Sequence, residues 1–342
     1  MNILITGYEG FIGNAIIGKL KGPENTIVGF GRDKNLKRVL PNVPDVVVKG
    51  DIRDTDLLRR IIAYYEIEEI YHFAAHSIVK ECANDPQSTF DINIMGTVAL
   101  LEACRISGDT VKSIVVSTSD KSFGAGKIPY TEESPINPAH TYETSKGCQQ
   151  LITRCYFHNY GVPTKVVACS NVYGPYDPNL SRIIPNTITR LAKGIPGQLN
   201  SGVKDFVREF VYIEDVVDAF IRVSRNGKDG EVYCCGGTEH LRVEDLLHKI
   251  CYAMGKNPET DIESFTRPAK LKEIADQYID STKLRSLGWA PKFSLDEGIA
   301  KSIDYYVGLV KGTINSPKES EETFEGSIRK LVKKCIRDES NN

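Results

Sequence analysis

Short apolar runs alternate with helical stretches along the first part of the chain. Residues 2–6 form one apolar run, a helical pattern covers residues 14–20, and a second apolar run follows at residues 26–30. Further apolar runs occupy residues 69–73 and 113–116. Apolar runs of this length, separated by helices, are typical of parallel strands that are buried on both faces. The order of elements predicts an α/β fold built on a doubly wound parallel sheet.

Three glycines follow the first run, where the chain turns from strand to helix. Gly7 permits a tight turn, Gly10 lets backbone N–H groups approach a pyrophosphate, and Gly13 allows the helix to pack closely on the strand. With Phe11 and Ile12 at the start of the helix, they predict a dinucleotide-binding loop. The alternative is an incidental flexible turn.

Composition narrows the class of protein. The chain has 342 residues, 41% of them hydrophobic and 26% charged, with a formal net charge of -2. This charge gives no basic footprint for nucleic acid, and no apolar run has the length of a membrane span. Nine cysteines are scattered without a C-x-x-C pair, and the histidines are equally dispersed. We therefore expect reduced thiols in a cytoplasmic protein and no metal site.

A second motif lies at the start of a helical stretch in the middle of the chain. Tyr142 and Lys146 are four residues apart, so they lie on one face of a helix. An ammonium group beside a phenol stabilises the phenolate, and we expect it to lower the pKa of Tyr142 so that the phenol can act as a general base. Taken alone, Y-x-x-x-K is a common accident on helix surfaces.

Together, the G-x-x-G-x-x-G spacing and the Y-x-x-x-K motif resemble the short-chain dehydrogenase/reductase superfamily. The length of the chain resembles its extended branch, the sugar-nucleotide epimerases and dehydratases, and the resemblance covers roughly residues 1–310. It implies a Rossmann-like domain, a bound nicotinamide cofactor, and a nucleotide-diphosphate sugar as substrate. It also implies a homodimer that forms through helices near 92–105 and 146–159.

The segment Ser119-Asp120-Lys121 directly follows a predicted strand and resembles the S-D-K of CDP-glucose 4,6-dehydratases and of inverting UDP-N-acetylglucosamine dehydratases. The resemblance implies that Ser119 binds the 4-hydroxyl of the sugar. Once C4 is oxidised, a base must take the proton at C5 and an acid must protonate the departing 6-hydroxyl. Lys121 would be the base, and Asp120 the acid if its pKa is raised. The alternative is an Asp-Lys surface pair at a strand end.

The end of the second apolar run predicts the choice of cofactor. Gly31 stands where NAD-dependent relatives often have Asp, and Arg32 follows, with basic residues shortly after it. Because Arg accommodates the 2′-phosphate, this favours NADP; NAD is the alternative, in which Asp33 would serve the ribose. By resemblance, Tyr142 and Lys146 also contact the cofactor, and Asn93 would orient the active-site backbone. The further cofactor contacts are Asp51, Ile52, Ala74, Ala75 and Asn93.

Six residues are predicted to bind the nucleotide sugar. Asn171 lies in a stretch similar to the N-V-Y-G-P of the family, and Arg208 lies in one similar to its R-x-F-x-x-x-x-D-V. A guanidinium at Arg208 would suit two diphosphate oxygens. The complete expected set is His76, Ser119, Asn171, Arg182, Arg208 and Arg267.

These observations predict an N-terminal dinucleotide-binding domain over residues 1–170, which also receives a segment near 206–225. A smaller α/β substrate-binding domain over 171–312 and a charged tail over 313–342 complete the chain. The expected function is sugar-nucleotide 4,6-dehydration. A sugar-nucleotide 4-epimerase or 4-ketoreductase on the same scaffold is the first alternative, and a non-catalytic NAD(P)-sensing protein is the second.

Overall fold

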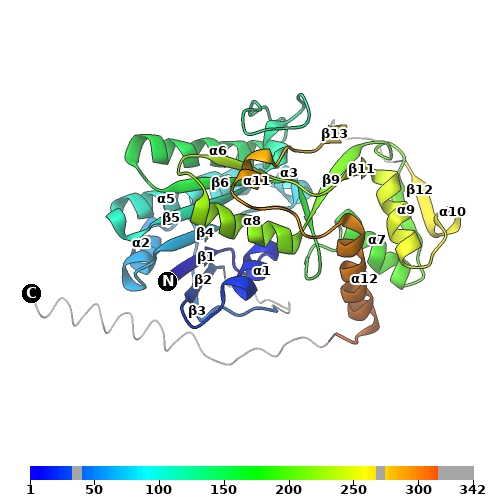
Figure 1. Cartoon of the computed structure of the whole chain (residues 1–342), viewed down its shortest axis with the longest axis horizontal. Helices are drawn as coiled ribbons and strands as arrows, with labels where there is room; N and C mark the ends of the chain where they lie inside the picture. Colours follow the sequence, from blue (N-terminus) through cyan, green and yellow to red (C-terminus); the bar gives the residue numbers. More distant parts are fainter. Residues whose placement is uncertain (33–40, 267–273, 315–342) are drawn as a thin grey trace, which may run out of the picture.

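A computed structural model describes residues 1–32, 41–266 and 274–314, and its largest element is a parallel sheet of seven strands (Figure 1). The strand order is β10-β6-β5-β4-β1-β2-β3. From β1 the chain first adds strands toward β3 and then, from β4 on, toward β10, as a doubly wound sheet requires. The α/β prediction is therefore confirmed. The strands are β1 (Asn2–Thr6), β2 (Thr26–Gly31), β3 (Val46–Lys49), β4 (Glu69–His72), β5 (Ser113–Ser119), β6 (Thr164–Cys169) and β10 (Val232–Cys235).

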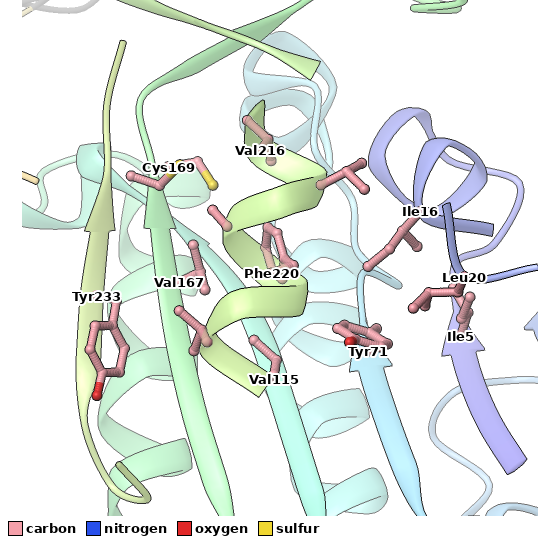
Figure 2. Close-up of a cluster of buried hydrophobic side chains, with 14 of the residues drawn as sticks. Ile5, Ile16, Leu20, Tyr71, Val115, Val167, Cys169, Val216, Phe220 and Tyr233 are labelled. Carbon is pink, nitrogen blue, oxygen red and sulfur yellow. The ribbon is translucent and has the colours of Figure 1, made fainter. Parts of the chain in front are cut away.

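Helices cover both faces of this sheet, and each face has its own apolar core. On one face, α1 (Phe11–Leu20) packs beside α8 (Ile213–Asn226), and Phe220 of α8 is directed toward Val115 and Val167 of the strands (Figure 2). The other face carries α2 (Thr55–Tyr64), α5 (Gly96–Ile106) and α6 (Thr141–Tyr160). Because the strands are buried on both faces, apolar residues follow one another in their central positions instead of alternating with polar ones.

The later part of the chain forms smaller sheets and a helical layer at one end of the large sheet (Figure 1). Strand β9 pairs with three others, and β8 pairs with β12. A third core holds these strands against three of the helices. The elements are β7 (Asn171–Tyr173), β8 (Gly197–Asn200), β9 (Val207–Tyr212), β11 (His240–Arg242), β12 (Ile262–Phe265), β13 (Asp276–Gln277), α7 (Ile183–Ala192), α9 (Val243–Ala253), α10 (Pro258–Asp261), α11 (Thr282–Ser286) and α12 (Leu295–Lys311).

The chain returns to the large sheet after entering the smaller part. Helix α8 and strand β10 both belong to the large sheet and its covering layer, although they follow β7 and β9 in sequence. The expected return near 206–225 lies partly in β9 and partly in α8. The exact division at residue 170 stays a prediction.

Residues 86–106 fold into three consecutive helical segments. They are α4 (Pro86–Phe90), a π-helical turn at Asp91–Met95, and α5. Single π-helical turns of this kind often lie at functional sites. Short helices α3 (Val79–Asn84), Gly108–Thr110 and Asp120–Phe123 complete the described elements.

Membrane-spanning helices and metal centres are both absent from the described ranges. No helix there is long and apolar enough to cross a membrane. In the same ranges, no group of three His, Cys, Asp or Glu side chains is arranged to hold a metal ion. The eight described cysteines are free thiols.

Candidate active site

A cavity of about 660 Å³ opens at the carboxyl ends of the parallel strands. Its walls come from the glycine loop after β1, from the ends of β2, β4, β5 and β6, and from the segment that leads into α7. In an open parallel sheet, this edge is where ligands bind.

The glycines of the first loop are required by the close approach of neighbouring backbone. Gly7 has a φ of 69°, and a Cβ atom on it would lie 2.7 Å from the backbone nitrogen of Ala74. A Cβ atom on Gly13 would lie 2.3 Å from the carbonyl oxygen of Gly7. The loop therefore brings the start of α1 against the end of β1 with no room for side chains at these two positions.

The N-terminus of α1 faces this cavity. Gly10 precedes the helix without a side-chain cap, and Phe11, Ile12 and Gly13 form its first turn. The backbone N–H groups of a first turn have no acceptor within the helix, so they can bind the oxygens of a pyrophosphate. The loop and the helix N-terminus thus fit the diphosphate of a dinucleotide.

Lys146 is held against the strand that carries the Ser-Asp-Lys segment. Its buried Nζ donates a hydrogen bond to the carbonyl oxygen of Ser117 at 3.0 Å. Burial lowers the pKa of Lys146 to about 8. Lys146 and Tyr142, one turn apart on α6, both line the cavity.

The pKa of Tyr142 differs from the expectation drawn from the sequence. Burial raises the pKa of its phenol, while the charge of Arg182 and a hydrogen bond with Ser119 oppose the rise. The expected lowering by Lys146 is wrong for the protein alone, because desolvation of the phenolate outweighs the opposing charges.

Ser119, Asp120 and Lys121 form the end of β5 and the short helical turn after it. The hydroxyl of Ser119 donates to Oδ1 of Asp120 at 2.9 Å and accepts from the backbone N–H of Lys121 at 3.3 Å. Ser119 and Lys121 line the cavity, whereas Asp120 lies behind its wall and is 1% exposed. Burial raises the pKa of Asp120, against the charge of Lys121.

Gln277, a residue that the sequence did not mark, meets this segment from β13. Nζ of Lys121 donates to Oε1 of Gln277 at 3.0 Å, and the amide is 1% exposed. Across the described residues, Nε2 of Gln277 and Oδ2 of Asp120 are buried without a hydrogen-bond partner. No local pattern could have identified this contact, because the two residues are 156 positions apart.

The end of the cavity near β2 contains most of the predicted cofactor contacts. Arg32, Asp51, Ile52, Ala74 and Ala75 line the cavity. Hydrogen bonds from the Arg53 side chain hold the pKa of Asp51 at about 2.

Glu9, which was not predicted, lines the same end. It lies in the glycine loop, where the motif predicted functions only for the glycines and for the start of the helix.

Asn93 lies behind the wall and not on it. Its Oδ1 accepts from the backbone N–H of His76 at 2.7 Å, and its Nδ2 donates to the carbonyl of His76 and to Oγ of Ser145. The amide is fully buried by these contacts. Asn93 therefore orients the backbone next to Ala75, as predicted, and its direct contact with the cofactor stays a prediction.

The six predicted substrate residues divide into three groups. Ser119, Asn171 and Arg182 line the cavity, with a guanidinium nitrogen of Arg182 3.5 Å from Oδ2 of Asp177. His76 and Arg208 do not line the cavity. Arg267 lies outside the described residues.

His76 and Arg208 are engaged by other parts of the protein. The His76 ring contacts Nη2 of Arg32 at 3.4 Å. The guanidinium of Arg208 donates to the carbonyls of Val207, Ile274 and Ala275. In this structure Arg208 therefore fixes the segment beside β13, and its predicted clamp on a diphosphate stays a prediction.

Comparison with known proteins places these observations in a family. The family described as GDP-mannose 4,6 dehydratase matches residues 4–302. The trifunctional UDP-glucose 4,6-dehydratase/UDP-4-keto-6-deoxy-D-glucose 3,5-epimerase/UDP-4-keto-L-rhamnose-reductase of Arabidopsis thaliana is 32% identical over 319 residues, which are 89% of this chain. The match covers 47% of that protein, so the chain spans about half the length of this relative.

A relative and a solved structure match over nearly their whole lengths. A UDP-glucose 4-epimerase of Mycolicibacterium smegmatis is 31% identical over 316 residues, covering 90% of this chain and 98% of the relative. The crystal structure of dTDP-glucose 4,6-dehydratase from Bacillus anthracis in complex with NAD has a TM-score of 0.79 and 28% identity. It covers 90% of this chain and 96% of the other.

Proposed function

The chain belongs to the GDP-mannose 4,6-dehydratase family, within the extended short-chain dehydrogenases/reductases, and on this premise we propose that it is a sugar-nucleotide 4,6-dehydratase. The observation that carries the proposal is the buried carboxyl of Asp120 next to Lys121, at the end of the strand that also positions Ser119 in the cavity. An epimerase has no use for this second acid and base.

The first step needs a base at the 4-hydroxyl of the sugar. Tyr142 would accept this proton, and Ser119 would hold the same hydroxyl by a hydrogen bond. Lys146, buried one turn away, would stabilise the phenolate that forms. The bound nicotinamide ring supplies the chemistry of taking a hydride from C4 and returning it to C6.

Elimination of water needs two further groups. Lys121, in its neutral form, would remove the proton from C5, which the 4-ketone has made acidic. Asp120, turning its carboxyl from behind the wall into the cavity, would give its proton to the departing 6-hydroxyl, which leaves as water. Burial raises the pKa of Asp120 and so favours the protonated carboxyl that this role requires. Lys121 would then return the proton to C5 as C6 receives the hydride, and the product is a 4-keto-6-deoxy sugar nucleotide.

The substrate is a nucleotide-diphosphate sugar. Arg182 supports this class, because its guanidinium lines the cavity and can bind diphosphate oxygens. Asn171 lies on the same wall with its Nδ2 bound to the carbonyl of Glu209, which leaves its side-chain oxygen for a ligand. We keep His76, Arg208 and Arg267 as proposed contacts from the motifs that predicted them.

The proposed cofactor is a nicotinamide dinucleotide. The relative from Bacillus anthracis contains NAD. Arg32, which lines the cavity at the end of β2, instead favours the 2′-phosphate of NADP. These two observations disagree on whether the cofactor is NAD or NADP. The carboxylate of Glu9, which lies beside Gly31, bears on this choice.

We also propose a homodimer in the cytoplasm. Large apolar side chains are exposed along the helical layer of α5 and α6, among them Met95 (51%), Leu151 (52%) and Tyr160 (57%). Exposed apolar side chains on neighbouring helices suit a helical interface with a second copy. Free thiols suit a reducing compartment.

Mass spectrometry tests the proposed reaction directly. The purified chain is incubated with CDP-glucose, UDP-glucose, UDP-N-acetylglucosamine, dTDP-glucose or GDP-mannose, without added reductant. Loss of one water from any of them establishes dehydration and identifies the nucleotide. An unchanged mass with an altered sugar configuration by NMR would support the 4-epimerase alternative, which the Mycolicibacterium relative favours.

Two other outcomes would support the remaining alternatives. Reduction of a 4-keto sugar nucleotide with consumption of reduced cofactor would identify a 4-ketoreductase. Binding of dinucleotide without turnover of any sugar nucleotide, unaffected by substitution of Tyr142, would support a sensing protein.

A further inference from the structure

The glycine loop places a carboxylate at the end of β2, a strand whose own residues include no acid; Asp33, which follows it, lies outside the described residues. Glu9 projects from the loop toward Gly31, the last residue of that strand. A Cβ atom built on Gly31 would lie 2.5 Å from Oε2, 2.7 Å from Oε1 and 2.7 Å from Cδ of Glu9. Both residues line the cavity.

The two oxygen distances are close to those within an aspartate side chain. In Asp, the two carboxylate oxygens lie about 2.4 Å from Cβ and the carboxyl carbon about 1.5 Å from it, as the standard bond lengths require. The oxygens of Glu9 therefore lie about as far from position 31 as the oxygens of an aspartate there would, with the carboxyl carbon farther away. Glycine at position 31 leaves room for this carboxylate, because any side chain there would collide with Glu9.

We propose that Glu9 binds the adenosine ribose of the dinucleotide in place of the missing acid on β2, and that the protein prefers NAD over NADP. In Rossmann folds an acidic residue at this strand end binds the ribose 2′-hydroxyl, and its charge repels a 2′-phosphate. Glu9 performs both tasks from the other side of the ribose site. The inference rests on the part of the proposed function that puts a dinucleotide in this cavity, and not on the sugar chemistry.

Arg32 would instead attract the 2′-phosphate of NADP, but its exposed position weakens this attraction. Its side chain is exposed at the rim, where it contacts the His76 ring and lowers the pKa of Asp51. An exposed charge is screened by salt, whereas Glu9 is half-buried beside the backbone of β2. The proposed preference for NAD is opposite to the one that the sequence favours.

Direct binding of reduced dinucleotides tests the inference without any sugar substrate. Any dinucleotide that copurifies with the full chain is identified by mass spectrometry and removed, and NADH and NADPH are then titrated by fluorescence. We expect NADH to bind at least tenfold tighter than NADPH. In Glu9→Gln, which keeps the size and loses the charge, that ratio should fall at least tenfold. Glu24→Gln, an exposed change away from the cavity, is the matched control and should keep the ratio.

A compensating pair makes the test independent of damage to the loop. Glu9→Ser combined with Gly31→Asp returns the carboxylate to the strand, and it should restore the preference for NADH that Glu9→Gln loses. Equal or tighter binding of NADPH by the unmodified chain would overturn the inference, and so would a ratio unchanged in Glu9→Gln. Failure of both dinucleotides to bind would overturn the proposed function as well.

Discussion

Lys121 and Gln277 are joined by a hydrogen bond of 3.0 Å from Nζ to Oε1, across 156 positions of sequence. The contact connects the end of β5 in the large sheet with β13 beside β9 in the smaller one. It fixes the position of the amine that the proposed elimination uses as its base.

Substitution of Gln277 should therefore slow the elimination step. Gln277→Leu removes the acceptor that holds Nζ of Lys121, and we expect kcat for water loss to fall about 10²-fold while reduced cofactor still forms from the sugar. Single-turnover mass spectrometry beside the absorbance of reduced nicotinamide measures both events. Gln198→Leu, a change at an exposed amide of β8, is the control and should leave kcat unchanged. Unchanged water loss in Gln277→Leu would contradict a positioning role.

Substitutions should separate the two parts of the proposed reaction, which are oxidation at C4 and loss of water. Lys121→Met removes the base for C5 and should slow water loss about 10²–10⁴-fold, while reduced cofactor still forms from the sugar. Tyr142→Phe should abolish both events, because oxidation at C4 comes first. Single-turnover absorbance of reduced nicotinamide, followed beside mass spectrometry, distinguishes them.

Lys112→Met is the control for the lysine change, since this lysine is exposed just before β5. Full water loss by Lys121→Met would contradict the dehydratase mechanism and return Asp120 and Lys121 to a structural role.

The sequence predicted those parts of the site that local patterns encode. Apolar runs specify buried strands, and a helix puts Tyr142 and Lys146 on one face whatever surrounds them. The glycine loop is equally local, because strand, turn and helix are consecutive. The structure brings these separate motifs to one cavity, as the resemblance implied.

What the sequence missed depends on contacts between distant segments. Gln277 meets Lys121 only through the pairing of β13 with β9, and no period or motif records that pairing. The direction of the pKa of Tyr142 was wrong because burial decides it, and burial is a property of the assembled cavity. The role proposed for Glu9 was also missed, because it depends on the contact between the glycine loop and Gly31, which has no side chain.

Glu209 should make the stability of the protein depend on pH. Burial raises the pKa of this carboxyl to about 8 from an ordinary value of 4.5. Between these values the folded protein binds more protons than the unfolded chain, so stability falls as pH rises from about 4.5 to about 8. Glu209→Gln, which mimics the protonated acid, should be more stable than the unmodified chain at pH 8 by about 2–4 kcal/mol.

Urea denaturation of both proteins at pH 5 and pH 8 checks this expectation. The difference in unfolding free energy between them should nearly vanish at pH 5. Glu214→Gln, an exposed change five positions along the chain, should show no such dependence. The same difference at both pH values would mean that Glu209 is not buried as a neutral acid.

Exposed apolar side chains on the α5 and α6 layer give a prediction for assembly. Leu151→Asp should dissociate the proposed dimer, because it would bury two uncompensated charges in a symmetric interface. Sedimentation velocity measures the result. Ile195→Asp, a change at a similarly exposed apolar residue outside these helices, is the control. A dimer that survives Leu151→Asp would place the interface elsewhere.

The close packing of the glycine loop gives the last prediction. Gly13→Ala forces a Cβ atom to within 2.3 Å of the Gly7 carbonyl oxygen, so α1 must move away from β1. We expect a loss of about 1–3 kcal/mol in unfolding free energy and at least a tenfold loss in NADH affinity, since the same movement displaces the helix N-terminus from the pyrophosphate. Gly126→Ala is the matched control, because a Cβ atom there has its nearest neighbour at 3.9 Å. If Gly13→Ala bound NADH normally, the first turn of α1 would not be the pyrophosphate site.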